Sequence, residues 1–201
     1  MIEMSRKIIF VILFSFILFS ACGTQAGFRY AVIDGEVTIT GYIGFNKNVV
    51  IPKEIYGIPV VTISNRAFAK KGLRSVVIPD SIKSIGTWAF CGNRLTSIVI
   101  PASVTSMGLA AFRRNQLTEV VIPPSISSIE DYVFTDNLLN SVVIPDSVVS
   151  IGEWAFAGNR LASVMIPDTV SFIHERAFEG NYAEDINTPF SIMIFRNTVT
   201  I

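Results

Sequence analysis

The sequence predicts a repeat solenoid of the α/β class, in which stacked coils present a parallel β-sheet on one face and short helical or 3₁₀ turns opposite. Two regularities predict this fold, and both have a period of 22 residues. A fixed period of this length is typical of coils that bury their apolar sides only by stacking on neighbours. An Ile-Pro pair begins at Ile78, Ile100, Ile122, Ile144 and Ile166. A phenylalanine recurs as Phe68, Phe90, Phe112, Phe134, Phe156 and Phe178.

One copy of the repeat indicates how each coil is built. The segment that starts at Leu95 predicts a short strand, with Ile98 and Ile100 pointing inward and Ser97 and Val99 pointing outward, because strand side chains alternate. The following proline ends the strand, since it has no N–H to offer the ladder. A glycine then begins the helical or 3₁₀ turn, and its Ala-Phe pair fills the core. A recurring asparagine leads into the next strand, and we expect its amide to bond backbone rather than to act in catalysis.

The segments on either side of the regular repeats predict caps. Two strand-like runs flank Asp34-Gly35, a dipeptide favoured in hairpin turns, so residues 28–48 are predicted to form an N-terminal β-hairpin cap. The repeated coils then occupy residues 49–182, and the first of them carries an insertion around Tyr56. Counting 22 residues from Val164 reaches Ile186, which predicts a degraded C-terminal capping coil over residues 183–201.

The first residues have the features of a secretory signal. Arg6 and Lys7 precede an apolar stretch over residues 8–19, which is shorter than the ~20 residues that a bilayer span needs. Small residues follow, as at a cleavage site. We therefore predict a signal peptide over residues 1–21 and an exported protein.

The cysteine after this signal indicates a lipid anchor. Residues 18–22 resemble a bacterial lipobox, in which the cysteine becomes the lipid-modified first residue, although Phe19 stands where leucine is usual. We expect lipidation at Cys22, a short polar tether over residues 22–27, and a membrane-anchored lipoprotein at the cell envelope or surface. Cleavage after Ala26 and an uncleaved anchor are the alternatives.

The repeat pattern as a whole resembles a known family. Leu-x-x-Val-x-Ile-Pro-x-Ser-Val-x-x-Ile-Gly-x-x-Ala-Phe-x-x-Asn is similar to the BspA-like (Treponema pallidum-type) leucine-rich repeats, and the resemblance extends from about Phe28 onward. It implies a parallel-sheet leucine-rich-repeat coil stack, commonly secreted or displayed on bacterial surfaces. Some members are implicated in attachment to host proteins or other cells, but no attachment motif can be carried over to residues of this chain.

Two columns of side chains are candidate partner-binding surfaces. The outward strand positions form an apolar column, which indicates an interface, although β-branched residues also suit strands generally. Its members are Val77, Val99, Val121, Val143 and Met165. The position before each Ala-Phe pair holds Trp88, Tyr132 and Trp154, which are either binding anchors or cover for the outer seam of the core.

Composition argues against several other functions. The 16 basic residues balance 16 acidic residues, so no electrostatic footprint for nucleic acid is evident. With one histidine and two cysteines, the chain lacks a multi-histidine zinc site and a disulfide framework. Cys91 occupies a variable repeat position without a neighbouring histidine, so we do not expect it to be a nucleophile. We predict no cofactor, no metal and no enzyme activity. A hydrolase that uses His174 with an aspartate at the coil edge is the remaining enzymatic alternative.

The sequence thus favours a non-catalytic binding module that recognises a protein ligand, either a host matrix protein or a bacterial envelope protein. Adhesion to host or neighbouring-cell proteins is the first interpretation. An envelope scaffold, or a protein that chiefly associates with itself, is the alternative. Both the cell surface and the periplasm fit the predicted export signal.

Overall fold

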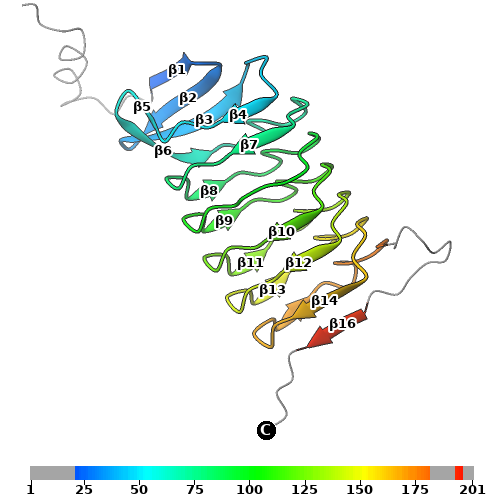
Figure 1. Cartoon of the computed structure of the whole chain (residues 1–201). Coiled ribbons are helices and arrows are strands. Elements are labelled where there is room, and N and C mark those ends of the chain that lie inside the picture. Colours follow the sequence, from blue (N-terminus) through cyan, green and yellow to red (C-terminus); the bar gives the residue numbers. More distant parts are fainter. Residues whose placement is uncertain (1–20, 182–192, 197–201) are drawn as a thin grey trace, which may run out of the picture.

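A computed structural model of the chain describes residues 21–181 and 193–196. These residues form an elongated stack of coils that begins with an antiparallel cap (Figure 1). The cap consists of β1 (Ala21–Gln25), β2 (Phe28–Ile33) and β3 (Glu36–Tyr42). Asp34 and Gly35 join β2 to β3 with φ angles of 50° and 78°, and two positive φ angles are what a type I′ hairpin turn requires. The structure thus contains the hairpin expected from the Asp-Gly pair.

The cap is larger than the sequence predicted. β1 pairs antiparallel with β2 and places Cys22 opposite Ala31. A strand therefore occupies most of residues 22–27, where we expected a polar tether. The expected tether lacked a strand signal because its residues are small and polar, whereas the pairing is provided by the neighbouring hairpin edge.

One face of the stack carries the strands that precede each Ile-Pro pair. Parallel pairing joins β4 to β7, β10 to β12, and β14 to β16. Residues 97–99, which we predicted as a strand, form none, so the ladder on this face is interrupted at their coil, and it is interrupted again between β12 and β14. The strands are β4 (Asn48–Val50), β7 (Ser75–Val77), β10 (Glu119–Val121), β12 (Ser141–Val143), β14 (Ser163–Ile166) and β16 (Met193–Arg196).

A second face carries shorter parallel strands from the following part of each coil. β3, β6, β8 and β9 continue one ladder, and β11, β13 and β15 form another. β5 pairs with β6 around the insertion at Tyr56. The strands are β5 (Glu54–Ile55), β6 (Ile58–Ile63), β8 (Ser84–Ile85), β9 (Ser106–Met107), β11 (Ser128–Ile129), β13 (Ser150–Ile151) and β15 (Phe172–Ile173).

The third side consists of turns, which corrects the prediction of helical or 3₁₀ segments and of an α/β class. No helix occurs among the residues that the structure describes. In five coils the cause is the residue two positions before the core phenylalanine, which has φ between 54° and 61° at every such position from Arg66 to Trp154. A left-handed residue stops right-handed helical winding. The turn closes instead, as when the Ala111 N–H donates to the Gly108 carbonyl at 3.2 Å.

The core is a continuous stack of phenylalanine rings. Neighbouring rings from Phe68 to Phe178 have centroids 5.1 to 5.6 Å apart and interplanar angles of 3° to 12°. Beside this stack runs a column of buried asparagines. The Asn115 Nδ2 donates to the carbonyls of Phe90 and Phe112 at 3.0 and 2.9 Å, and its Oδ1 accepts from the Leu95 N–H. The asparagine column is therefore structural, and it bonds each coil to the one before.

The last described strand corrects the predicted register of the C-terminal coil. β16 pairs with β14 so that Val164 lies opposite Ile194 and Met165 opposite Phe195. The 22-residue count would have placed Ile186 opposite Val164, and Ile186 lies outside the described residues. The final coil is therefore longer than the others. Because Ile166 lies opposite Arg196 in this pairing, no Ile-Pro pair marks the last strand, and the sequence offered no marker for the extra residues.

Candidate binding surfaces

Six apolar side chains form one exposed column on the first sheet face, and we call this column the valine strip. Their exposed fractions lie between 55% and 80%. The β-ladder aligns Val50 with Val77 and Val121 with Val143. At ~4.8 Å per coil, the strip is about 24 Å long. Its members are Val50, Val77, Val99, Val121, Val143 and Met165.

Five members of the strip were candidates from the sequence, and Val50 was missed. The signal for Val50 was present, because it stands between Val49 and the Ile51-Pro52 pair. The insertion around Tyr56 lengthens its coil and breaks the 22-residue spacing. The structure recovers the position through the pairing of β4 with β7.

The strip has hydroxyl groups along one side and rests on a buried layer. The outward position two residues before each strip member holds an exposed serine in four coils. In a fifth coil it holds Glu119, the single charge at this position. Alternate residues of the same strands, such as Val76, Val120 and Val164, are buried in the core. The strip is therefore a firmly supported, uncharged surface with a polar margin, which is the make-up of many protein interfaces.

The aromatic column is covered by the protein's own side chains. Tyr132 and Trp154 stack with centroids 6.4 Å apart. The guanidinium carbons of Arg66, Arg113 and Arg176 lie 5.4 to 5.6 Å from the ring centroids of Trp88, Tyr132 and Trp154, respectively. All three rings are half-buried. These contacts favour the structural interpretation, in which the rings seal the outer seam of the core.

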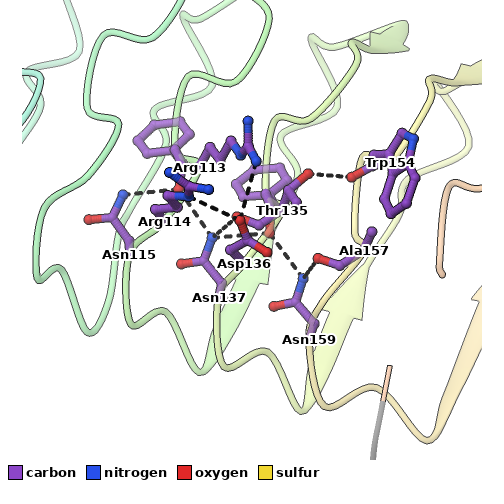
Figure 2. Close-up of polar contacts among 11 residues, drawn as sticks. Arg113, Arg114, Asn115, Thr135, Asp136, Asn137, Trp154, Ala157 and Asn159 are labelled. Carbon is purple, nitrogen blue, oxygen red and sulfur yellow. Dashed lines mark hydrogen bonds and ion pairs between the residues drawn. The ribbon is translucent and has the colours of Figure 1, made fainter. Parts of the chain in front are cut away.

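A polar network holds one of these guanidinium groups in place (Figure 2). Arg113 and Arg114 both contact the carboxylate of Asp136, at 3.5 and 3.2 Å. In the coil of Arg113 the aromatic position holds Ala110, which has no ring. Arg113 therefore lies over Tyr132 of the next coil. The Thr135 hydroxyl donates to the Trp154 carbonyl and links the next pair of coils. The network joins three successive coils on the turn side.

The reactive residues do not form a catalytic arrangement. Burial raises the pKa of the Cys91 thiol, against the opposing charges of Arg113, Arg114 and Lys70, so little thiolate is present near neutral pH. His174 is half-buried beside the Phe172 ring, with centroids 6.2 Å apart, and its Nδ1 has no hydrogen-bond partner. Within residues 21–181 and 193–196, no three His, Cys, Asp or Glu side chains group so that they could hold a metal ion.

One shallow depression of about 410 Å³ opens on the second sheet face. Gly86, Thr87, Ser106 and Gly108 line it together with Glu130. The Gly86 and Gly108 N–H groups already donate to Ile63 and Ile85 of the preceding coils. The depression therefore offers one carboxylate and a few hydroxyls, which do not make a catalytic set.

The stacked coils and parallel ladders define a leucine-rich-repeat type of solenoid, and in the described part of the chain no helix is both long and apolar enough to span a membrane. The family model for the BspA type leucine rich repeat region matches residues 61–195 in six copies. The chain belongs to this family, as its repeat pattern predicted. The matched model describes a repeat and not a catalytic domain. No curated protein matches the chain.

Several solved structures are similar to this chain. The leucine-rich repeat protein of Treponema pallidum is 29% identical, with a TM-score of 0.63, and the match covers 86% of this chain and 85% of that one. A leucine-rich cell surface protein of Faecalibacterium prausnitzii is 27% identical, with a TM-score of 0.62, over 79% of this chain and 52% of that one. The pneumococcal vaccine antigen PcpA shares the fold at 20% identity, with a TM-score of 0.68, over 81% of this chain and 48% of that one. The chain thus spans about half the length of the last two proteins.

Proposed function

We propose that this protein is an exported, non-catalytic binding module whose valine strip is the surface that recognises a protein partner. The observation that carries the proposal is the run of six exposed apolar side chains in six coils. Apolar columns of this length on a soluble surface are typical of interaction sites. The similar Faecalibacterium prausnitzii protein is a cell surface protein, which supports export of this chain.

Recognition by this surface would depend on shape and apolar contact. The strip has no charge, and Glu119 is the one charged side chain in the column beside it. Binding is therefore expected to change little between low and physiological salt, since screening acts on charge pairs. The serine hydroxyls on the margin can exchange water for hydrogen bonds with a partner's backbone.

Lipid attachment at Cys22 completes the proposal. An acyl chain there would start within β1, because the backbone of Cys22 pairs with Ala31. The cap would then lie at the membrane without an intervening tether. Mass spectrometry of the N-terminal peptide from the purified protein tests this, because acylation adds mass to a peptide that begins at Cys22. An unmodified peptide that begins at Gly27 would support cleavage after Ala26 instead.

Charge substitutions test the strip directly. We expect Val99→Glu with Val121→Glu to abolish binding to host matrix proteins or to the producing cell's purified envelope, while the fold is retained because both side chains are exposed. Val149→Glu is the matched control, since Val149 is 47% exposed on the other sheet face. Sedimentation of the same variants reports on self-association. The proposal fails if the double variant folds and every interaction of the parent protein survives.

Localisation needs a separate measurement. We expect protease treatment of intact producing cells to remove the protein if it works as an adhesin. Protection until the outer envelope is opened would instead support the periplasmic scaffold. A cytoplasmic protein digested in neither condition serves as the control for lysis.

A further inference from the structure

The balanced net charge conceals an uneven distribution of cations. Basic side chains gather where the turn side meets the first strand face, and we call this set the basic corner. The segments 70–74, 92–96 and 114–118 of three successive coils contain no acidic residue, and Asp136 in the next coil is the first. The basic corner comprises Lys47, Lys70, Lys71, Arg74, Arg94, Arg113 and Arg114.

Hydrogen bonds to backbone carbonyls place these cations side by side on consecutive coils. The Lys47 Nζ donates to the Lys71 carbonyl, and the Arg74 N–H donates to the Lys47 carbonyl, both at 2.7 Å. The Arg94 N–H donates to Leu73 at 2.8 Å, so Arg94 follows one coil later. At ~4.8 Å per coil, the basic corner extends about 15 Å along the stack.

Most of these cations lack an acidic partner. Elsewhere on the described surface, Lys53 pairs with Asp80 at 2.8 Å and Lys83 pairs with Glu36 at 3.3 Å. Within the basic corner, Arg113 and Arg114 share Asp136, but the other five form no ion pair with any described carboxylate. Lys47, Lys70, Arg74 and Arg94 are exposed, so several positive charges lie close together in solvent. Such an arrangement attracts polyanions.

Two of the cations occupy backbone positions that suit glycine better. The last residue of each turn has positive φ, and three coils place Gly92, Gly158 or Gly180 there. Lys70, Arg114 and Asp136 adopt the same conformation with φ of 55°, 56° and 57°. Residues other than glycine adopt this conformation rarely, so these turns hold charged side chains at a backbone cost, the acidic Asp136 as well as the two cations.

We propose that the basic corner binds a linear sulfated polysaccharide, whose sulfate groups contact the lysines and arginines of successive coils. A chain of spaced anions matches cations that repeat along one edge, and the guanidinium fork of Arg74 and Arg94 can donate two hydrogen bonds to one anionic group. This site is separate from the valine strip, so it does not depend on the proposed protein-binding function.

The neighbouring side chains favour a polysaccharide over single-stranded nucleic acid. Single-stranded nucleic acid needs open aromatic rings for its bases, but Trp88 and Tyr132 are covered by Arg66 and Arg113. Anionic lipid can also attract a basic surface, and the vesicle probe below separates that outcome from a polysaccharide. The exposed residues between these cations are polar, namely Thr96, Gln116 and Thr118, whereas the exposed ring of Phe45 stands two residues from Lys47 in the first coil of the corner.

The test compares two triple variants of the full chain in a non-ionic detergent. The first variant carries Lys70→Gln, Arg74→Gln and Arg94→Gln. The control variant carries Arg29→Gln, Lys53→Gln and Lys83→Gln, which removes the same charge from exposed sites outside the corner. The readouts are the NaCl concentration that elutes each protein from immobilised heparin, and the Kd for heparin at physiological salt. Circular dichroism and thermal melting verify that both variants fold.

We expect the corner variant to bind heparin about tenfold or more weakly than the parent chain, while the control variant changes less than about twofold. Equal losses in both variants would mean that binding follows net charge alone, and would overturn the proposal. Hyaluronan, which lacks sulfate, and vesicles of phosphatidylglycerol in phosphatidylcholine are the comparison probes. Corner-dependent binding to either probe as tight as binding to heparin would overturn the assignment to sulfated polysaccharide.

Discussion

At the scale of single residues, the buried asparagines show how one side chain joins two coils. Asn137 accepts from the Leu117 N–H at 3.1 Å and donates to the Phe112 and Phe134 carbonyls at 3.1 and 3.0 Å. All of these groups are removed from water, so their hydrogen bonds cannot be replaced by solvent. A recurring asparagine in a repeat is explained by this role without any chemistry.

We expect Asn137→Ala to lower the free energy of unfolding by about 2 kcal/mol, because it leaves the buried Leu117 N–H without a partner and removes one of two hydrogen bonds from the Phe112 and Phe134 carbonyls, which Asn115 and Asn159 still contact. Asn140→Ala, at an exposed position three residues away, is the control and should change stability by less than about 0.5 kcal/mol. Urea denaturation followed by circular dichroism measures both. Similar midpoints for the two variants would contradict the structural role of the asparagine column.

The buried thiol gives a second prediction at this scale. Because burial raises the pKa of Cys91, its thiolate fraction at pH 8 is smaller in the folded protein than in the unfolded chain. We expect iodoacetamide to alkylate Cys91 at least tenfold more slowly under native conditions than in concentrated urea, with the rate rising as the pH increases. Peptide mass spectrometry separates Cys91 from Cys22. Equal rates in the two conditions would show that the thiol is accessible in the folded state.

At the scale of elements, the recurring glycine allows each coil to lie close to the one before. A Cβ on Gly108 would lie 2.5 Å from the Thr87 backbone nitrogen, and one on Gly152 would lie 2.7 Å from the Asp131 nitrogen. Both positions meet fixed backbone, which cannot move without shifting a whole coil. Ser64, Glu130 and His174 replace this glycine in three coils, so only the coils of Gly86, Gly108 and Gly152 depend on the close approach.

We expect Gly108→Ala to destabilise the protein by about 2 kcal/mol, because the added methyl group forces two coils apart. Gly41→Ala in β3 is the control, since its Cβ would meet the Arg29 Cδ at 3.6 Å, an ordinary contact. Thermal melting compares the two variants. If Gly108→Ala melts no lower than Gly41→Ala, the close approach of the coils does not limit stability.

The sequence predicted the repeat, the inward and outward positions and the hairpin, because each follows from a fixed period or a local turn signal. It did not predict the turn side correctly, because positive φ at residues such as Trp88 and Tyr132 leaves no mark in residue type. It predicted five members of the valine strip but missed Val50, whose spacing an insertion alters. The basic corner was missed for a different reason: net charge sums over the chain, whereas the corner depends on which coils lie side by side.

At the scale of the whole molecule, the stack is less uniform than its repeat. The first face lacks a ladder between β12 and β14, but there β13 continues the second face. On the first face residues 97–99 also form no strand, and on the second face no ladder joins β9 to β11, so both faces are interrupted near this point. The turn side remains continuous there, since Phe112 donates to the Val133 carbonyl at 3.0 Å. The phenylalanine rings also stack across this point, 5.6 Å apart between Phe112 and Phe134. In a solenoid each coil is stabilised mainly by its neighbours, so missing ladder bonds weaken one particular junction.

We expect this junction to divide the molecule into two parts that open separately. In native-state hydrogen exchange, Asn159→Ala should speed exchange of the amides in β12, β13 and β14 about tenfold or more, because it removes buried hydrogen bonds to Leu139, Phe134 and Phe156. Amides in β6, β7 and β8 should keep their protection within about threefold, since the loss does not pass the weak junction. Asn93→Ala, which breaks bonds to Leu73, Phe68 and Phe90, is the matched variant on the other side and should give the reverse pattern. If either substitution speeds exchange equally in both groups of strands, the coils open as one cooperative unit and the interrupted ladders do not weaken the stack.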